Sequence, residues 1–220
     1  MTQYNIIAES QEYTVVAEFD HVATPAEAYQ SEADLEKEFI RLLGEQGYEY
    51  LPIHKEADLI FNLRDQLEKL NHYHFTDNEW EHFFNECIAN KNDDIVAKTA
   101  KIQDDYIQVL KRDTGESQNI KLIDKDNIHN NFVQVINQYV EEGGNYDTRY
   151  DVSILVNGLP LVHIELKRRG VQLKEAFNQI NRYQRDSFWA GCGLYEYVQI
   201  FVISNGTNTK YYSNTTRANH

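Results

Sequence analysis

An alternating run of apolar and polar residues centred on Asn157-Gly158 limits, more than any other feature, how this chain can fold. The run has the two-residue period of β-strands, and an Asn-Gly pair between two such segments predicts a hairpin. One face of the hairpin is apolar and comprises Val152, Ile154, Val156, Val162, Ile164 and Leu166. The other face carries Asp151, Ser153, His163, Glu165 and Lys167. The sequence therefore predicts a hairpin with one core face and one face that can form a site.

The length of the turn decides whether the carboxylates of that second face meet. The two carboxylates are Asp151 and Glu165. A two-residue turn, Asn157-Gly158, would put them on opposite faces of the hairpin. A three-residue turn that also includes Leu159 would place them directly opposite each other. Because only the second register assembles the charged residues, we expect the three-residue turn.

Two carboxylates on adjacent strands suit a hard divalent cation. Mg²⁺ or Mn²⁺ binds oxygen ligands and keeps positions open for water and for a phosphate oxygen. Lys167 lies two residues beyond Glu165 on the same face. Its ammonium would stabilise the negative charge that builds up on a reacting phosphate, or orient the attacking water. The same residues also fit an ordinary solvated strand, in which they would carry no chemistry.

Residues 172–184 predict a helix, because they contain no proline or glycine and repeat apolar or aromatic residues at helical spacing. Gln179 and Tyr183 are four residues apart and therefore share one face of it. From that face they can reach the charged edge of the hairpin or a DNA backbone, with Arg182 and Arg185 close by for phosphates. The alternative is that Tyr183 is a core residue and that Gln179 is solvated.

These residues resemble a known family. The span from Asp151 to Lys167 is similar to the core of the PD-(D/E)xK nuclease superfamily, with Tyr150 in the position of the signature proline. Gln179 and Tyr183 resemble the Gln-x-x-x-Tyr element of RecB-like nucleases. The likeness is closest to the N-terminal endonuclease domain of the type I restriction R subunit (HsdR), and it covers essentially the whole chain.

The resemblance implies an α/β fold with a central mixed β-sheet flanked by helices. It implies Mg²⁺-dependent endonucleolytic cleavage of double-stranded DNA, with Asp151 and Glu165 as metal ligands and Lys167 as the cation that stabilises charge or orients water. Gln179 and Tyr183 would position the site or contact DNA. Four arginines would bind the DNA backbone: Arg168, Arg169, Arg182 and Arg185.

The resemblance also implies partners outside this sequence. R subunits continue into an ATP-driven helicase motor and a helical region that docks on the methyltransferase (M) and specificity (S) subunits. This sequence contains no Gly-x-x-x-x-Gly-Lys-Ser/Thr phosphate loop. We therefore expect the chain to be the cutting module alone, with ATP acting only through the missing motor and with sequence specificity residing in other subunits.

A helix that begins at Ser31 offers a third acidic residue. Ser31 and Asp34 form the start of a capping box ahead of an apolar periodic run. In nucleases of this type an acidic residue on the first core helix often assists the metal, and Glu32 is the best match, with Glu36 and Glu38 as alternatives. Glu32 could equally well serve only to complement the helix dipole.

Charge is distributed unevenly along the chain, whose formal net charge is −14. Residues 144–220 hold nine Lys or Arg against six acids, whereas residues 1–143 hold 12 against 29. The carboxyl half is thus the better candidate for the DNA-facing side. We expect the acidic half to form a solvated surface or a docking face for a basic partner. We do not expect the chain to bind DNA tightly by itself.

We expect one endonuclease domain over residues 1–220, with an acidic, elaborated part at 1–143 and the catalytic hairpin, helix and following strands at 144–220. Further predicted elements are a strand at 48–53, helices at 57–70 and 78–89, and strands at 106–110, 120–123, 132–139 and 198–203. No segment approaches membrane length, and Cys87 and Cys192 fit neither a disulfide framework nor a zinc cluster. These features predict a cytoplasmic protein without a membrane partner.

Two other classes of function stay open on the sequence. A repair exonuclease or junction resolvase of the same fold would show a basic surface and would cleave DNA unaided. A non-catalytic scaffold that couples DNA to the motor would leave Asp151, Glu165 and Lys167 splayed apart, with no metal bound.

Overall fold

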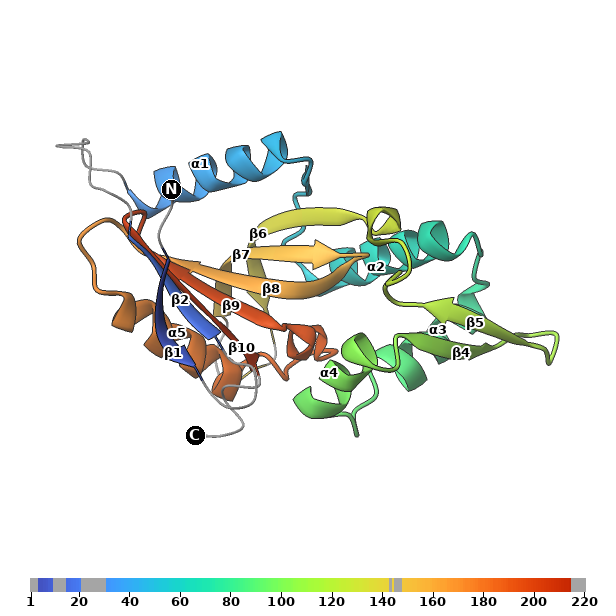
Figure 1. The fold of residues 1–220 in the computed structure, drawn as a ribbon. Coiled ribbons are helices and arrows are strands. Elements are labelled where there is room, and N and C mark those ends of the chain that lie inside the picture. The colour runs from blue at the N-terminus through green and yellow to red at the C-terminus, as the bar shows by residue number, and fades with distance from the viewer. Residues whose placement is uncertain (1–3, 10–14, 21–30, 143, 145–147, 215–220) are drawn as a thin grey trace.

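A mixed eight-stranded sheet forms the centre of the molecule in the computed structural model, which describes residues 4–9, 15–20, 31–142, 144 and 148–214 (Figure 1). In spatial order the strands are β1 (Tyr4–Glu9), β2 (Val15–Asp20), β10 (Asn208–Ser213), β9 (Ile200–Ser204), β8 (Leu159–Leu166), β7 (Thr148–Val156), β6 (Val133–Glu141) and β3 (Glu49–Tyr50). The β8–β9 and β3–β6 pairs are parallel and the others are antiparallel. The predicted mixed sheet is therefore confirmed.

Helices cover both faces of this sheet. Helix α1 (Glu32–Glu45) lies on one face. The opposite face belongs to the larger core, to which these elements contribute: α2 (Glu56–Asn71), α3 (Asp77–Phe83) with the π-helical turn η1 (Phe84–Ile88), α4 (Ile95–Gln103), α5 (Leu173–Asp186) and the 3₁₀ turn η3 (Leu194–Tyr197). A separate hairpin, β4 (Ile107–Lys111) and β5 (Ser117–Lys121), and the short turn η2 (Ile128–Asn130) complete the described elements. The α/β fold class is confirmed.

Both faces of the central hairpin pack against a hydrophobic core, whereas only one core face was predicted. The apolar face packs under α1, where Leu43 meets Val152, Ile164 and Leu166 in a small cluster. The face expected to hold the polar residues is not a solvated surface, because it lies against the larger core that contains Tyr150, Leu155, Tyr183, Tyr195 and Phe201. Ser153, His163 and Glu165 are accordingly buried in that core.

The hairpin turn differs from the prediction, although the predicted register is present. Asn157 and Gly158 both have positive φ, of 51° and 83°, and form a two-residue turn that pairs Val156 with Leu159. The three-residue turn was therefore the wrong choice. A register shift between Ile154 and Leu155 leaves Leu161 as an extra residue on β8. This bulge restores the pairing of Val152 with Ile164, and with it the alignment of Asp151 beside Glu165.

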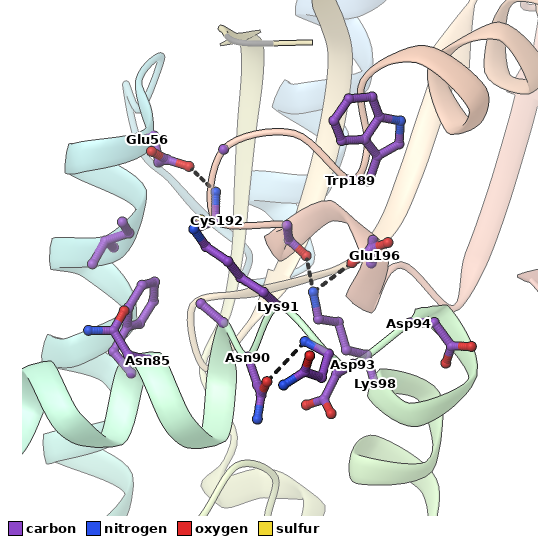
Figure 2. Close-up of a pocket in the computed structure, with 16 residues that line it drawn as sticks. Glu56, Asn85, Asn90, Lys91, Asp93, Asp94, Lys98, Trp189, Cys192 and Glu196 are labelled. Carbon is purple, nitrogen blue, oxygen red and sulfur yellow. Dashed lines mark hydrogen bonds and ion pairs between the residues drawn. The ribbon is translucent and has the colours of Figure 1, made fainter.

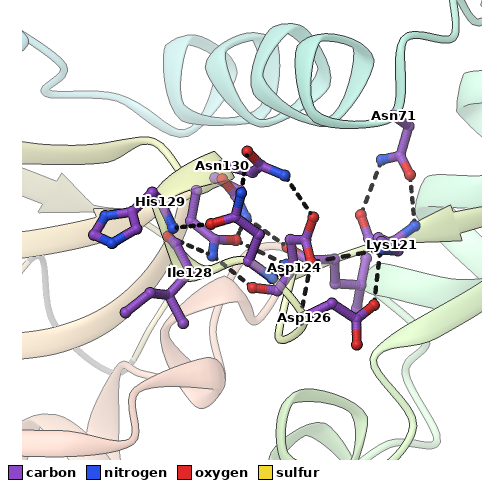
Figure 3. A network of polar contacts seen from close by, with 11 residues as sticks. Asn71, Lys121, Asp124, Asp126, Ile128, His129 and Asn130 are labelled. Carbon is purple, nitrogen blue, oxygen red and sulfur yellow. Dashed lines mark hydrogen bonds and ion pairs between the residues drawn. The ribbon is translucent and has the colours of Figure 1, made fainter.

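A network of amide and carboxylate side chains in the loop between β5 and β6 (Figure 3) is bonded to the Asn157-Gly158 turn. The buried Asn157 donates to the Leu122 carbonyl at 3.0 Å and to Asn131 Oδ1 at 2.8 Å. Asp124 accepts from Asn130 at 2.9 Å and from the backbone N–H of Asn127 at 3.1 Å. These bonds lower the pKa of Asp124 to about 2, so the loop keeps its charge and its shape at neutral pH.

The other predicted elements are largely present, with shifted ends. The capping box of Ser31 and Asp34 starts α1 as predicted, and the helices expected at 57–70 and 78–89 correspond to α2 and to α3 with η1. The strand expected at 48–53 is wrong in length, because only Glu49–Tyr50 pair with β6. The sequence reasoning missed α4, β1, β2 and β10.

None of the described helices combines the length and the apolar character needed to cross a membrane. Cys87 and Cys192 are both free, in agreement with the expectation that they form no disulfide.

Replacing Gly158 by alanine should destabilise the fold strongly. An added Cβ would lie 2.6 Å from Leu63 Cα on the buried side of α2, and the backbone there has a φ of 83°. Strain and overpacking together should lower the free energy of unfolding by about 2–4 kcal/mol, as measured by urea denaturation. Gly115→Ala is the matched control, because Gly115 also has positive φ (85°) but no atom within 4 Å of the added Cβ. Equal losses in the two variants would contradict the tight packing of the turn on α2.

Candidate functional site

Three predicted residues, Asp151, Glu165 and Lys167, meet at one end of the β7–β8 hairpin. Asp151 lies on β7, and its Oδ2 accepts the Leu166 N–H at 2.9 Å. Glu165 lies on β8, and its Oε1 accepts a charge-assisted bond from Lys167 Nζ at 2.7 Å. The backbone N–H of Lys167 continues the parallel pairing with β9 by donating to the Ser204 carbonyl at 2.8 Å. The splayed arrangement expected of a scaffold is absent from these three residues.

Burial sets the electrostatics of the two carboxyls. Desolvation, together with the charge of Glu165, raises the pKa of Asp151 to about 7. The pKa of Glu165 is also raised by burial, although Lys167 opposes the shift. Two carboxyls that resist ionisation side by side favour either a proton or a cation between them. Near neutral pH a bound cation would therefore displace the proton that Asp151 holds.

One oxygen of this site has no partner. Glu165 is fully buried, and its Oε2 makes no hydrogen bond. A buried carboxylate oxygen without a donor is costly, and a bound cation would satisfy it. Asp151 and Glu165 thus fit an ion such as Mg²⁺, which uses one or two carboxylates and fills its other positions with water and phosphate oxygens. Among the described residues no group of three or more His, Cys, Asp or Glu side chains is placed to hold a metal ion, so this site would rest on two carboxyls.

Gln179 and Tyr183 share a face of α5, as their spacing predicts, and they contact each other. The Gln179 amide donates to the Tyr183 hydroxyl, which in turn donates to the Arg149 carbonyl at 3.2 Å, two residues before Asp151. The Tyr183 ring is buried and lies 5.1 Å from that of Tyr150. Burial and the nearby charge of Glu165 raise the pKa of the Tyr183 phenol, so it stays neutral. Tyr183 is therefore a core residue, as the alternative expected, and it is also bonded to the backbone two residues before Asp151.

The acidic residues of α1 separate into one near the site and two away from it. Glu32 Oε1 accepts the Arg168 N–H at 3.2 Å, and its charge contributes to the raised pKa of Glu165. Glu36 is engaged elsewhere, since it accepts from Asn137 at 2.6 Å and from Gln138 on β6. Glu38 forms a surface ion pair with Arg41. Of the three, only Glu32 stays a candidate for assisting a metal.

The four arginines predicted to bind DNA are exposed. Arg168 and Arg169 directly follow Lys167, and Arg182 and Arg185 lie on α5. The Arg182 guanidinium lies 6.0 Å from the centre of the Tyr183 ring, whereas that of Arg185 forms a bidentate pair with Asp186 at 2.8 and 2.9 Å. The guanidinium of Arg182 thus lies against the ring of Tyr183, next to the Gln179–Tyr183 pair.

A cavity of about 680 Å³ lies away from these residues, between α2, η1, α4 and the loop before η3 (Figure 2). Its main polar groups satisfy one another: Lys98 donates to Glu196 at 2.6 Å and to the Gly193 carbonyl at 2.9 Å, and Glu56 accepts the Cys192 N–H at 2.6 Å. It contains none of the predicted site residues. The size of this cavity therefore does not lead to the predicted site residues.

Sequence reasoning missed the aromatic surroundings of the site. The rings of Tyr150, Tyr183, Phe188, Tyr195 and Phe201 all lie within 6.5 Å of the His163 ring, between centroids. They come from β7, β9, α5, η3 and the loop between α5 and η3, and no local pattern in the sequence links them. Only the placement of His163 on the polar face of the hairpin gave a signal.

The fold and the site define a class: α/β proteins of the restriction-endonuclease type, in which a hairpin of a mixed sheet presents two acidic residues and a lysine. The model of the family described as type I restriction enzyme R protein N terminus matches residues 29–220. The chain belongs to this family, as the resemblance of its motifs implied.

Relatives from bacteria and an archaeon agree with this assignment. The chain is 48% identical over 212 residues to the endonuclease subunit of the type I restriction enzyme EcoprrI from Escherichia coli, which covers 96% of this chain and 67% of that protein. It is 41% identical over 191 residues to the SsaAORF53P endonuclease subunit from Staphylococcus saprophyticus, covering 84% of this chain and 20% of that protein. A putative MjaIXP endonuclease subunit from Methanocaldococcus jannaschii is 36% identical over 112 residues, covering 47% of this chain and 10% of that protein. The chain thus spans only a fifth of its staphylococcal relative.

The raised pKa of Asp151 predicts how metal-free stability depends on pH. The folded state holds this proton up to about pH 7, whereas the ordinary value is 3.8. Stability from protonation is therefore complete below pH 4 and is lost as the pH rises through 7. Asp151→Asn should remove this loss and be more stable than the wild type at pH 8, by on the order of 1–3 kcal/mol in urea denaturation.

The exposed Asp105 supplies the control, since Asp105→Asn should leave the pH dependence unchanged. Adding Mn²⁺ at pH 8 should raise the melting temperature of the wild type but not that of Asp151→Asn, because the metal binds the ionised carboxylates. A wild type whose melting temperature ignores Mn²⁺ at this pH would contradict the assignment of Asp151 and Glu165 as a cation site.

Proposed function

We propose that this chain is the Mg²⁺-dependent endonuclease domain of a type I restriction R subunit and cleaves double-stranded DNA. The observation that supports this most is the unsatisfied Oε2 of the buried Glu165, beside Asp151 and in contact with Lys167. A purely structural hairpin would gain nothing from burying a carboxylate in this state. Membership in the R protein family and the names of the relatives support the same reading.

Asp151 and Glu165 are the residues that would hold the ion. A bound Mg²⁺ supplies polarisation of the scissile phosphate and a more acidic water at neutral pH. Lys167 lies within 2.7 Å of Glu165 Oε1, where its ammonium can stabilise the charge that accumulates on the phosphate and orient the attacking water. Glu32 is placed to assist from α1.

Gln179 and Tyr183 act on the position of the site. Through its bond to the Arg149 carbonyl, Tyr183 fixes the start of β7 and hence the backbone that carries Asp151. Gln179 holds the phenol in place and lies at the partly exposed edge where DNA would pass. The exposed Arg168, Arg169, Arg182 and Arg185 would bind the DNA backbone without reading its sequence.

The rest of the R subunit would supply what this chain lacks. The staphylococcal relative is about five times as long as the part matched here. We place the ATP-driven translocase outside this chain, and the docking on the M and S subunits within the full-length protein. The formal net charge of −14 opposes unaided capture of DNA, so delivery by the translocase fits this domain better than the independent action of a repair exonuclease or resolvase.

Asp151→Ala and Glu165→Ala should each abolish DNA cleavage by the assembled restriction enzyme, by at least about a thousandfold, because each removes a ligand of the metal. ATP hydrolysis by the same complexes should be retained, since the motor is elsewhere. The measurement is conversion of supercoiled plasmid to nicked and linear forms, alongside phosphate release. Glu175→Gln, an exposed change on α5, is the control and should cut normally. Cleavage that survives in both alanine variants would overturn the nuclease assignment and favour the scaffold.

A further inference from the structure

His163 is a buried ionisable group of the hairpin that the proposed chemistry leaves unused. Its side chain is fully buried, and neither Nδ1 nor Nε2 has a hydrogen-bond partner. An imidazole always carries at least one N–H, so this arrangement leaves a donor unsatisfied in the core. Such a residue is costly unless a partner becomes available in another state of the protein.

The nearest acceptor is the unpaired oxygen of the site. His163 Nε2 lies 3.7 Å from Glu165 Oε2, which is beyond hydrogen-bond length but within reach of a small rotation of the carboxylate. The terminal torsion of a glutamate side chain is soft, so this rotation costs little. Two buried groups without partners, a possible donor and an acceptor, thus lie across a short gap from each other.

The ring itself cannot move away. It contacts Tyr150 at 5.4 Å and Phe188 at 5.4 Å between ring centres, and Tyr183 at 6.0 Å. These rings come from β7, α5 and the loop that follows α5. The aromatic surroundings therefore hold the plane of the His163 ring and bring it against Tyr183 of the Gln179–Tyr183 pair.

We propose that His163 is a positioning residue that donates its Nε2–H to Glu165 Oε2 and so orients this carboxylate for the metal. Lys167 holds Oε1 and His163 would hold Oε2, so the carboxylate plane is set from both sides, while each oxygen keeps a second lone pair with which it could bind the ion. Side chains that orient metal ligands typically change metal affinity by 10–100-fold when they are removed. The inference rests on the proposed metal site, and it adds to that site a residue that does not touch the ion.

The test is Mn²⁺ binding to the 220-residue chain at pH 8, with free Mn²⁺ counted by electron paramagnetic resonance. His163→Leu keeps the apolar bulk and removes the donor, and it should weaken Mn²⁺ binding by about 10–100-fold. His163→Gln supplies an amide N–H near the position of Nε2 and should stay within a few-fold of the wild type. Equal affinities in the wild type and His163→Leu, with Asp151→Asn showing no binding, would overturn the role of His163 while leaving the metal site intact. No Mn²⁺ binding by the wild type would overturn both.

A second measurement needs no variant and decides the case if His163→Leu does not fold. The ¹⁵N chemical shifts of the imidazole report which nitrogen carries the proton. The proposal expects the proton on Nε2 in the wild-type chain, with the Nε2 signal moving when Mg²⁺ is added. A ring protonated on Nδ1 alone would leave no donor toward Glu165 and would overturn the proposal.

Discussion

The burial of the Glu165 carboxylate is the constraint to which the other features of this structure respond. A carboxylate removed from water loses a large hydration energy unless it is paired, protonated or bound to a metal. Lys167 offsets part of that loss at one oxygen, and the other oxygen is left without a partner. The fold buries an acidic group completely, where its charge is costly, and places it two residues from a histidine that is enclosed by aromatic rings. An arrangement of this kind is typical of sites that are completed by a ligand.

Part of this site could be predicted from the hairpin sequence, and part could not. Alternation alone identified Asp151, Glu165 and Lys167, because a period of two fixes which side chains share a face. The turn could not be predicted in the same way. An Asn-Gly turn has the backbone twist that hairpins favour, and Asn157 and Gly158 adopt it. The register was then corrected by a bulge at Leu161, a feature that depends on packing against both faces and leaves no local signal in the sequence.

The same division applies to the rest of the chain. Helix α1 was predictable from its capping box and its amphipathic spacing, and α5 from its amphipathic spacing alone, because these are local properties. The short α4 and the strands β1, β2 and β10 were not, because tertiary contacts decide them. The depth of burial of Glu165 and His163 was also beyond the sequence, since it arises from rings that lie on η3, β9 and the loop after α5. Motif spacing therefore located the candidate site residues, whereas long-range packing determined their electrostatics.

The position of the site follows from the one parallel pair at the centre of the sheet. β8 runs antiparallel to β7 but parallel to β9, so the end of β8 lies beside the end of β9 and the beginning of β7. Asp151 lies near the start of β7, Glu165 lies near the end of β8, and Lys167 directly follows β8. The Lys167 backbone is tied to Ser204 of β9, and the start of β7 is tied to Tyr183 of α5. All three charged side chains are therefore carried by backbone that is bonded on more than one side. A metal-dependent reaction requires ligands held within a fraction of an ångström. Asp151 and Glu165 meet this requirement because both lie on paired strands of the sheet and not on a loop.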